Sequence, residues 1–94
     1  MTADELWDGE HRGIVVDGKP VLIVRIDGTI RAYADRCAHL GVKLSDGALD
    51  GCVLTCRAHH YTYDVCTGKG INPASAKLVE YPLEIVDGEI VVHT

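Results

Sequence analysis

The sequence predicts an all-β fold, a small antiparallel barrel or sandwich. Short apolar runs follow one another closely, Asp-Gly pairs separate several of them, and no stretch of eleven or more residues has helical periodicity. Asp-Gly between two apolar runs is a strong hairpin signal, because both residues tolerate positive φ. From Gly13 onward these pairs begin at Asp17, Asp27, Asp46, Asp50 and Asp87.

The expected elements begin with a helical turn and continue as strands. Thr2 and Glu5 have the spacing of a capping box, which predicts one helical turn that ends before Gly9. Trp7, the single Trp, is predicted to be a core or rim anchor. The predicted strands cover residues 14–16, 21–26, 29–34, 53–55, 61–63, 83–85 and 90–92.

The middle of the chain carries two mixed pairs of potential metal ligands, Cys37-x-His39 and Cys56-x-x-His59. Zinc fingers usually place two Cys in one pair and two His in the other. The mixed order suits a binuclear cluster in which one iron takes both thiolates and the other takes both imidazoles. Because predicted strands lead into and out of the second pair, we expect the ligands on two loops at the ends of β-hairpins.

Size and charge narrow the possible partners. The 94 residues predict one domain, residues 1–94, and 47% apolar residues predict a globular one. A net charge of −5 argues against nucleic acid and anionic membranes as partners. The N-terminus lacks the features of a signal peptide, which predicts a cytoplasmic protein. A reducing cytosol disfavours disulfides, so Cys52 and Cys66 are predicted to be small packed thiols.

The pairs Cys37-x-His39 and Cys56-x-x-His59 resemble a Rieske motif. Segments 6–10, 56–59, 67–73 and 80–84 resemble the Rieske-type ferredoxins of bacterial multicomponent toluene and alkene monooxygenases. The resemblance implies a Rieske fold, in which a small antiparallel base carries an inserted two-loop cluster-binding subdomain over about residues 36–73. Related ferredoxins usually have a β-strand before the first helical turn. Only five residues precede Leu6 here, so we expect that edge strand to be absent or very short.

The resemblance also implies the cofactor and its ligands: one Rieske-type 2Fe–2S cluster held by Cys37, His39, Cys56 and His59. His60 follows the last ligand and is predicted to be an exposed neighbour. The residues implied to surround the cluster are Leu40, Gly41, Ala58, Tyr61, Tyr63 and Pro73.

The same comparison predicts a potential that is low for a Rieske centre. High-potential members have a disulfide between the two loops, at positions that are Val42 and Ala58 here, so that bridge is excluded. They also have a Ser where this chain has Tyr61, which we expect to pack beside the cluster. Tyr63 acts in the opposite direction, because it stands where a Tyr hydroxyl reaches the sulfur of the first Cys, Cys37 here.

The function implied by the resemblance is one-electron transfer, without catalysis. The donor would be an NADH-dependent flavin and iron–sulfur reductase, the acceptor a di-iron hydroxylase, and the free protein a monomer. The alternatives are a Rieske ferredoxin of a ring-hydroxylating dioxygenase, a structural zinc module that mediates protein contacts, and a Rieske-like domain of a nitrite or assimilatory reductase. His11 and His93 are predicted to be solvated, and Thr67–Gly70 lacks the spacing of a phosphate-binding loop.

Overall fold

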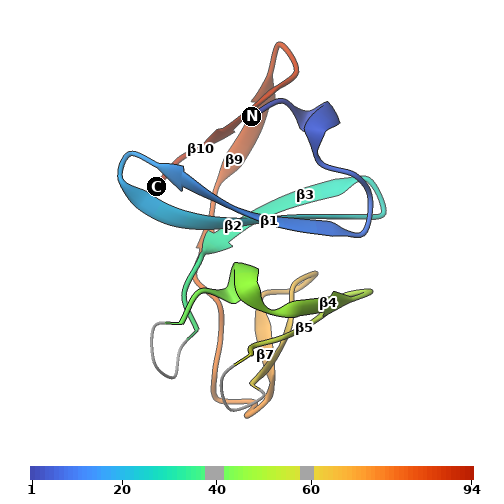
Figure 1. Cartoon of the computed structure of the whole chain (residues 1–94), viewed down its shortest axis with the longest axis vertical. Helices are drawn as coiled ribbons and strands as arrows, with labels where there is room; N and C mark the ends of the chain where they lie inside the picture. The colour runs from blue at the N-terminus through green and yellow to red at the C-terminus, as the bar shows by residue number, and fades with distance from the viewer. Residues whose placement is uncertain (38–41, 58–60) are drawn as a thin grey trace.

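The computed structural model describes residues 1–37, 42–57 and 61–94. These residues form β-strands, two 3-10 helices and no α-helix, which confirms the predicted all-β class (Figure 1). The 3-10 helices are η1, Ala3–Glu5, and η2, Leu44–Asp46. The strands are β1 Glu10–Val16, β2 Lys19–Ile26, β3 Thr29–Ala34, β4 Ala48–Asp50, β5 Val53–Thr55, β6 Thr62–Asp64, β7 Lys69–Asn72, β8 Glu80–Tyr81, β9 Leu83–Val86 and β10 Glu89–Val92.

Tight Asp-Gly turns define three antiparallel hairpins, β1–β2, β2–β3 and β9–β10. At Asp17, Asp27 and Asp87 the φ angle is 50°, 51° and 50°, and the following glycine is also positive in each case. Two consecutive positive φ angles match the right-handed twist of the strands that they join. The hairpins predicted at these three pairs are therefore confirmed.

The other two Asp-Gly pairs behave differently. Asp46 ends η2, and Gly47 is extended, with φ −82° and ψ 178°. A Cβ at Gly47 would collide with the carbonyl oxygen of Thr55, so glycine is needed there for close packing. Gly51, between β4 and β5, has a φ of 59°, whereas Asp50 does not have a positive φ.

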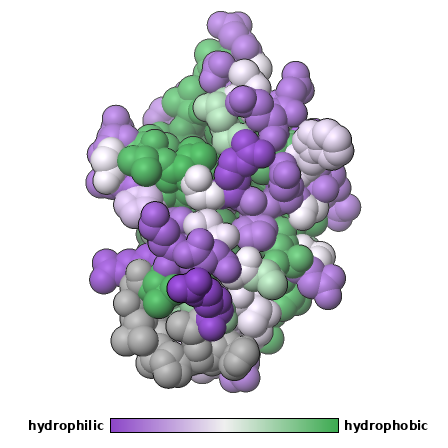
Figure 2. All heavy atoms as spheres, in the orientation of Figure 1, coloured by the Kyte–Doolittle hydropathy of each residue, from purple (hydrophilic) through white to green (hydrophobic). Residues whose placement is uncertain are grey.

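The base of the molecule consists of two sheets. One has the strand order β1-β2-β3-β8, and the other pairs β9 with β10. The apolar cluster of the base is formed by Leu6, Val21, Ile23, Ala32, Ile90 and Val92. Figure 2 shows mainly hydrophilic side chains on one face, with hydrophobic ones gathered in the upper part that holds β9 and β10.

A third sheet, β4-β5-β6-β7, is inserted in the sequence between β3 and β8, which are neighbours in the first sheet. It lies below the base in Figure 1. A larger apolar cluster joins the two parts: Leu22, Val24 and Tyr33 from the base, and Leu54, Tyr63 and Val65 from the insertion, among others. The Tyr33 hydroxyl donates a 2.5 Å hydrogen bond to the carbonyl of Val65. The predicted architecture, a base with an inserted subdomain, is therefore confirmed.

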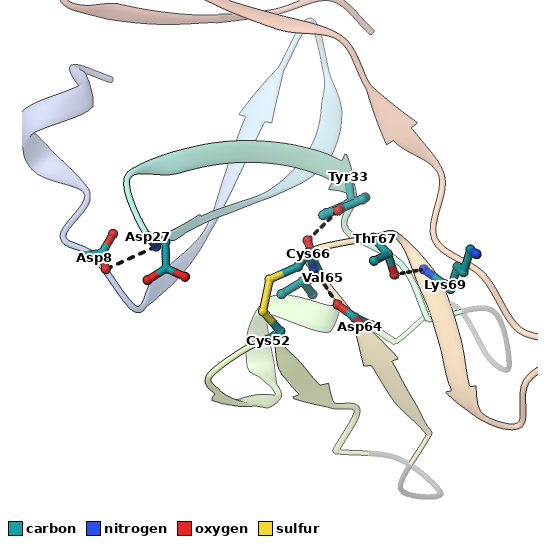
Figure 3. Close-up of a disulfide and its surroundings, with 9 residues drawn as sticks. All are labelled: Asp8, Asp27, Tyr33, Cys52, Asp64, Val65, Cys66, Thr67 and Lys69. Carbon is teal, nitrogen blue, oxygen red and sulfur yellow. Dashed lines mark hydrogen bonds between the residues drawn. A yellow bond between two sulfur atoms is a disulfide. The ribbon is translucent and has the colours of Figure 1, made fainter.

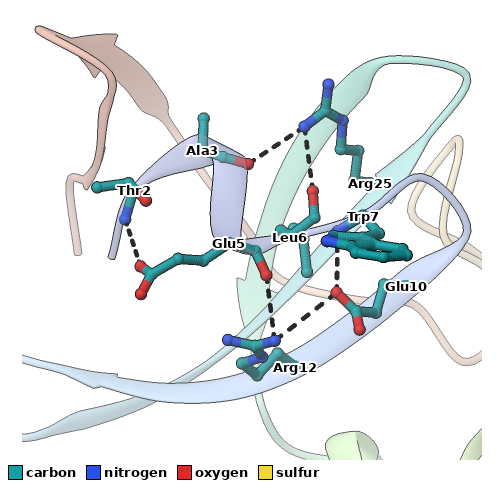
Figure 4. A network of polar contacts seen from close by, with 8 residues as sticks. All are labelled: Thr2, Ala3, Glu5, Leu6, Trp7, Glu10, Arg12 and Arg25. Atoms are coloured by element: carbon teal, nitrogen blue, oxygen red, sulfur yellow. Dashed lines mark hydrogen bonds and ion pairs between the residues drawn. The ribbon is translucent and has the colours of Figure 1, made fainter.

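The N-terminal segment confirms one expectation and overturns another (Figure 4). The Thr2 amide donates to Glu5 Oε2 at 2.7 Å, as the capping box predicts. Before the helical turn, where we expect the edge strand to be absent or very short, Thr2 forms a single β-bridge with Glu89. Trp7, however, is 75% exposed, so its prediction as an anchor is wrong. Leu6 is fully buried instead, because the Arg25 guanidinium donates to the carbonyls of Ala3 and Leu6 and fixes this turn against β2.

Candidate metal centre

The predicted ligands belong to two segments of equal length, residues 37–42 and 56–61, and a main-chain hydrogen bond joins the ends of each. The Cys37 amide donates to the carbonyl of Val42 at 2.8 Å, and the Cys56 amide donates to the carbonyl of Tyr61 at 2.7 Å. Each predicted ligand loop thus begins with a Cys that is bonded to the residue five positions later. The predicted ligands and neighbours that lie outside the described residues are His39, Leu40, Gly41, Ala58, His59 and His60.

The two predicted thiolate ligands are both deeply buried. Cys37 is 1% exposed and Cys56 is fully buried, and both belong to the larger apolar cluster. β5 ends directly before Cys56, whereas β3 ends three residues before Cys37. Two buried thiols in one apolar cluster fit the sulfur-held iron of a mixed-ligand cluster, because such iron is bound by Cys thiolates.

Tyr63 makes the contact that its sequence position predicts. Its hydroxyl lies 3.3 Å from Cys37 Sγ, and the residue is fully buried. A metal-bound thiolate can only accept a hydrogen bond, so the tyrosine is then the donor. Tyr61 is half-buried and packs against the same apolar cluster, as expected of a packing residue.

The loop around Pro73 is tightly closed. The Ala76 amide donates to the carbonyl of Pro73 at 3.1 Å, and a Cβ on Gly70 would collide with the carbonyl of Ala76. The Gly68 amide donates to the carbonyl of Asp64, which makes this Gly-rich segment a turn, as expected. Cover of the cluster by half-buried Pro73 stays a prediction.

Asp35 is a site residue that sequence reasoning missed. It is 3% exposed, and its carboxylate accepts hydrogen bonds from the Ser45 amide at 2.8 Å and the Ser45 hydroxyl at 2.6 Å. A Cβ at Gly13 would lie within 3 Å of both side chains, so that glycine leaves room for the pair. Asp35 precedes the first loop and Ser45 follows it, so their hydrogen bonds tie its two ends together. The available signal was an Asp two residues before Cys37.

The fate of Cys52 and Cys66 is the main correction (Figure 3). They form a disulfide, with Cα atoms 5.5 Å apart, so the prediction of two separate thiols is wrong. Cys52 directly precedes β5 and Cys66 closely follows β6, and antiparallel pairing brings these ends together. The prediction relied on compartment chemistry and did not use the hairpin that the flanking strands already indicated.

Two peripheral histidines differ from each other. His93 is exposed and lies 3.2 Å from Glu84 Oε1, as expected of a solvated residue. His11 is half-buried, and its Nε2 lies 3.0 Å from the carbonyl oxygen of Gly47, so its predicted solvation is wrong. The residue joins β1 to the turn that follows η2.

Comparison with known proteins decides the family. The Rieske [2Fe-2S] domain model matches residues 1–82 of the chain. The chain belongs to the Rieske [2Fe-2S] domain family. The cofactor of this Rieske protein is accordingly one Rieske-type 2Fe–2S cluster. No helix in the described ranges of the Rieske chain is long and apolar enough to cross a membrane.

The relatives of this Rieske protein are ferredoxin components of oxygenase systems. It is 41% identical over 93 residues to that of the alkene monooxygenase system of Xanthobacter autotrophicus, covering 97% of this chain and 75% of the relative. It is 30% identical over 93 residues to that of the naphthalene 1,2-dioxygenase system of Pseudomonas putida, covering 98% and 89%. Each of these relatives is named as the ferredoxin component, the electron-transfer subunit of its system, and not as a catalytic enzyme.

Solved structures share the fold of the Rieske protein. The ferredoxin of carbazole 1,9a-dioxygenase from Nocardioides aromaticivorans has a TM-score of 0.86 and 27% identity, covering 98% of this chain and 91% of that one. A complex of reduced oxygenase and oxidized ferredoxin in carbazole 1,9a-dioxygenase gives a TM-score of 0.86 and 31% identity, covering 97% and 86%. The second structure contains a ferredoxin in complex with an oxygenase.

Proposed function

We propose that this protein passes single electrons from an NADH-dependent flavin and iron–sulfur reductase to the di-iron hydroxylase of a hydrocarbon monooxygenase of the toluene and alkene class. The observation that carries the proposal is the 41% identity to an alkene monooxygenase ferredoxin over nearly the whole chain. The two buried thiols at the ends of paired loops supply the matching site.

Four residues would hold the cluster: Cys37 and Cys56 on one iron, and His39 and His59 on the other. When bound, the cluster supplies a one-electron couple, and two neutral imidazoles in place of thiolates raise its potential. The chain's own contribution is to fix the ends of the two ligand loops. Main-chain hydrogen bonds close both loops, and Asp35 ties the ends of the first.

The potential would be low for a Rieske centre. This chain lacks the inter-loop disulfide of high-potential members, since Val42 occupies one of the two positions. The disulfide that it does have joins the opposite end of the β5–β6 hairpin and does not replace that bridge. The Tyr63 hydroxyl lies close to Cys37 Sγ and would stabilise the more negative, reduced state of the cluster. It would therefore raise the potential and partly offset the effect of the missing inter-loop disulfide.

Partner recognition would be transient. A net charge of −5 suits a carrier that meets successive partners through complementary charge. Electron-transfer interfaces are small, below about 1,200 Å² in total, which a domain of 94 residues can supply. We expect the free protein to be a cytoplasmic monomer; gel filtration and cell fractionation measure both.

The second candidate function is delivery of electrons to a ring-hydroxylating dioxygenase. Two observations favour it: naphthalene dioxygenase ferredoxins are 30–34% identical to this chain, and the solved relatives with a bound oxygenase belong to carbazole dioxygenase. The third sheet and its two loops would serve either acceptor. A structural zinc module is disfavoured by membership of the Rieske family.

A stopped-flow experiment distinguishes the two acceptors. The reduced protein is mixed anaerobically with a purified alkene monooxygenase hydroxylase or a naphthalene dioxygenase oxygenase, and re-oxidation is followed by visible absorbance. We expect a second-order rate constant at least about tenfold larger with the hydroxylase, which corresponds to about 1.4 kcal/mol in activation free energy. An equal or larger constant with the dioxygenase would transfer the proposal to the second candidate.

A further inference from the structure

A group of potential metal ligands surrounds the disulfide (Figure 3). One ligand atom from each of Cys52, Asp64 and Cys66 lies within 4.8 Å of the other two. The three residues of β5 separate Cys52 from Cys56, and the four steps between the two Cα atoms cover about 13 Å along an extended strand. The group therefore sits at the opposite end of the β5–β6 hairpin from the second ligand loop.

We propose that this group is a redox-gated site for a thiophilic divalent cation such as zinc. A dithiol reductant of the thioredoxin class opens the bond between Cys52 and Cys66: two electrons and two protons pass to the sulfurs, and the reductant becomes a disulfide. One zinc ion then displaces the two thiol protons and takes two thiolates and the Asp64 carboxylate. Water completes four-coordination, as in open zinc sites with three protein ligands.

The backbone already has suitable spacing for this ligand set. Two thiolates on one tetrahedral zinc, at about 2.3 Å from the metal, are about 3.8 Å apart. With Cα atoms 5.5 Å apart, side-chain rotation can reach that separation without moving the strands. The Cys66 amide donates to Asp64 Oδ1 at 2.9 Å, and such a bond orients a ligating carboxylate.

The site is also accessible. All three side chains are half-buried, and Cys66 lines a cavity of about 180 Å³ together with Val65 and residues of β2 and β3. Disulfide and cation exclude each other, because the same sulfurs form both. A bound cation therefore favours the dithiol state, and oxidation releases the cation.

Metal retention on the cluster-loaded protein tests this proposal. Disulfide and phosphine-reduced forms are incubated with zinc chloride, desalted, and analysed for zinc and iron. We expect about one zinc per two irons in the reduced form and essentially none in the disulfide form. Equal zinc in both forms, or none in either, overturns the proposal, and this comparison requires no variant.

Variants locate the zinc. The double variant Cys52→Ser, Cys66→Ser keeps every predicted cluster ligand and should lose the zinc, while Asp64→Asn should weaken zinc affinity at least tenfold. Asp50→Asn, an exposed carboxylate on the same sheet, is the matched control and should bind as the parent does. Zinc retained by the double variant, or unchanged affinity in Asp64→Asn, refutes the site. The iron content reports whether each variant has folded around its cluster.

Discussion

Replacing Tyr63 with Phe removes one hydroxyl from a fully buried position beside Cys37 Sγ, at 3.3 Å. The aromatic ring and its packing stay, so the change removes the hydroxyl together with its hydrogen bond to Cys37 Sγ. Reduction makes a cluster sulfur more negative, and a donor to that sulfur is therefore stronger in the reduced state. We predict that Tyr63→Phe lowers the reduction potential.

The size of the shift follows from the strength of one hydrogen bond. One hydrogen bond contributes a net free energy of about 0.5–1.5 kcal/mol. If all of it favours the reduced state of the cluster, this free energy is the upper bound of the change in reduction potential. For a one-electron couple about 59 mV corresponds to a factor of ten, or about 1.4 kcal/mol. The expected decrease is therefore about 20–60 mV.

Protein-film voltammetry on the parent and the variant measures the shift directly. Tyr81→Phe is the matched control, because Tyr81 lies on β8 in the base and packs against the other apolar cluster. Its potential should equal that of the parent. An unchanged or higher potential in Tyr63→Phe would remove this hydroxyl from the account of the potential.

Three other predictions concern the ligands, the loop tie and alkaline stability. His59→Ala should bleach the visible absorption, while His60→Ala should leave the spectrum largely intact; a bleached His60 variant alone would exchange the two assignments. Asp35→Ala leaves the two donors of half-buried Ser45 without their acceptor and should cost about 1–3 kcal/mol in chemical denaturation, whereas an unchanged midpoint contradicts that role. Burial raises the pKa of Tyr33 from 10.0 to about 12, so its contribution to stability is full below pH 10 and is lost as the pH rises towards about 12. Over that interval we expect the free energy of unfolding to fall by about 2–3 kcal/mol, and the Tyr33→Phe variant to lack this loss.

Local chemistry explains why much of the fold was predictable. Each turn at Asp17, Asp27 and Asp87 depends on two adjacent residues that tolerate positive φ, the Asp and the Gly after it. Both can be read directly from the sequence. β3 was predicted with its observed bounds, Thr29–Ala34, because such a turn starts it. The Asp46-Gly47 pair does not form a hairpin turn, although it is the same dipeptide, and it lies at the end of a 3-10 helix instead. Close packing of Gly47 against Thr55 of β5 decides the conformation there.

The cluster ligands stay a prediction, because His39 and His59 lie outside the described residues. The spacing of Cys37 and Cys56 relative to their histidines is a property of two short loops, and the structure closes both loops with equivalent main-chain bonds. The contact between Tyr63 and Cys37 joins residues 26 positions apart, and it was expected only from the resemblance to Rieske proteins.

Sequence alone thus determined three hairpin turns and the all-β class, because each depends on residues that are neighbours along the chain. Only the tertiary structure decided that Cys52 meets Cys66, that Asp35 meets Ser45, and that Leu6 rather than Trp7 is buried. The physical reason is that contacts between distant residues depend on strand pairing and on competition for core volume. Strand pairing and core packing both depend on the fold of the whole chain and not on any short segment of it.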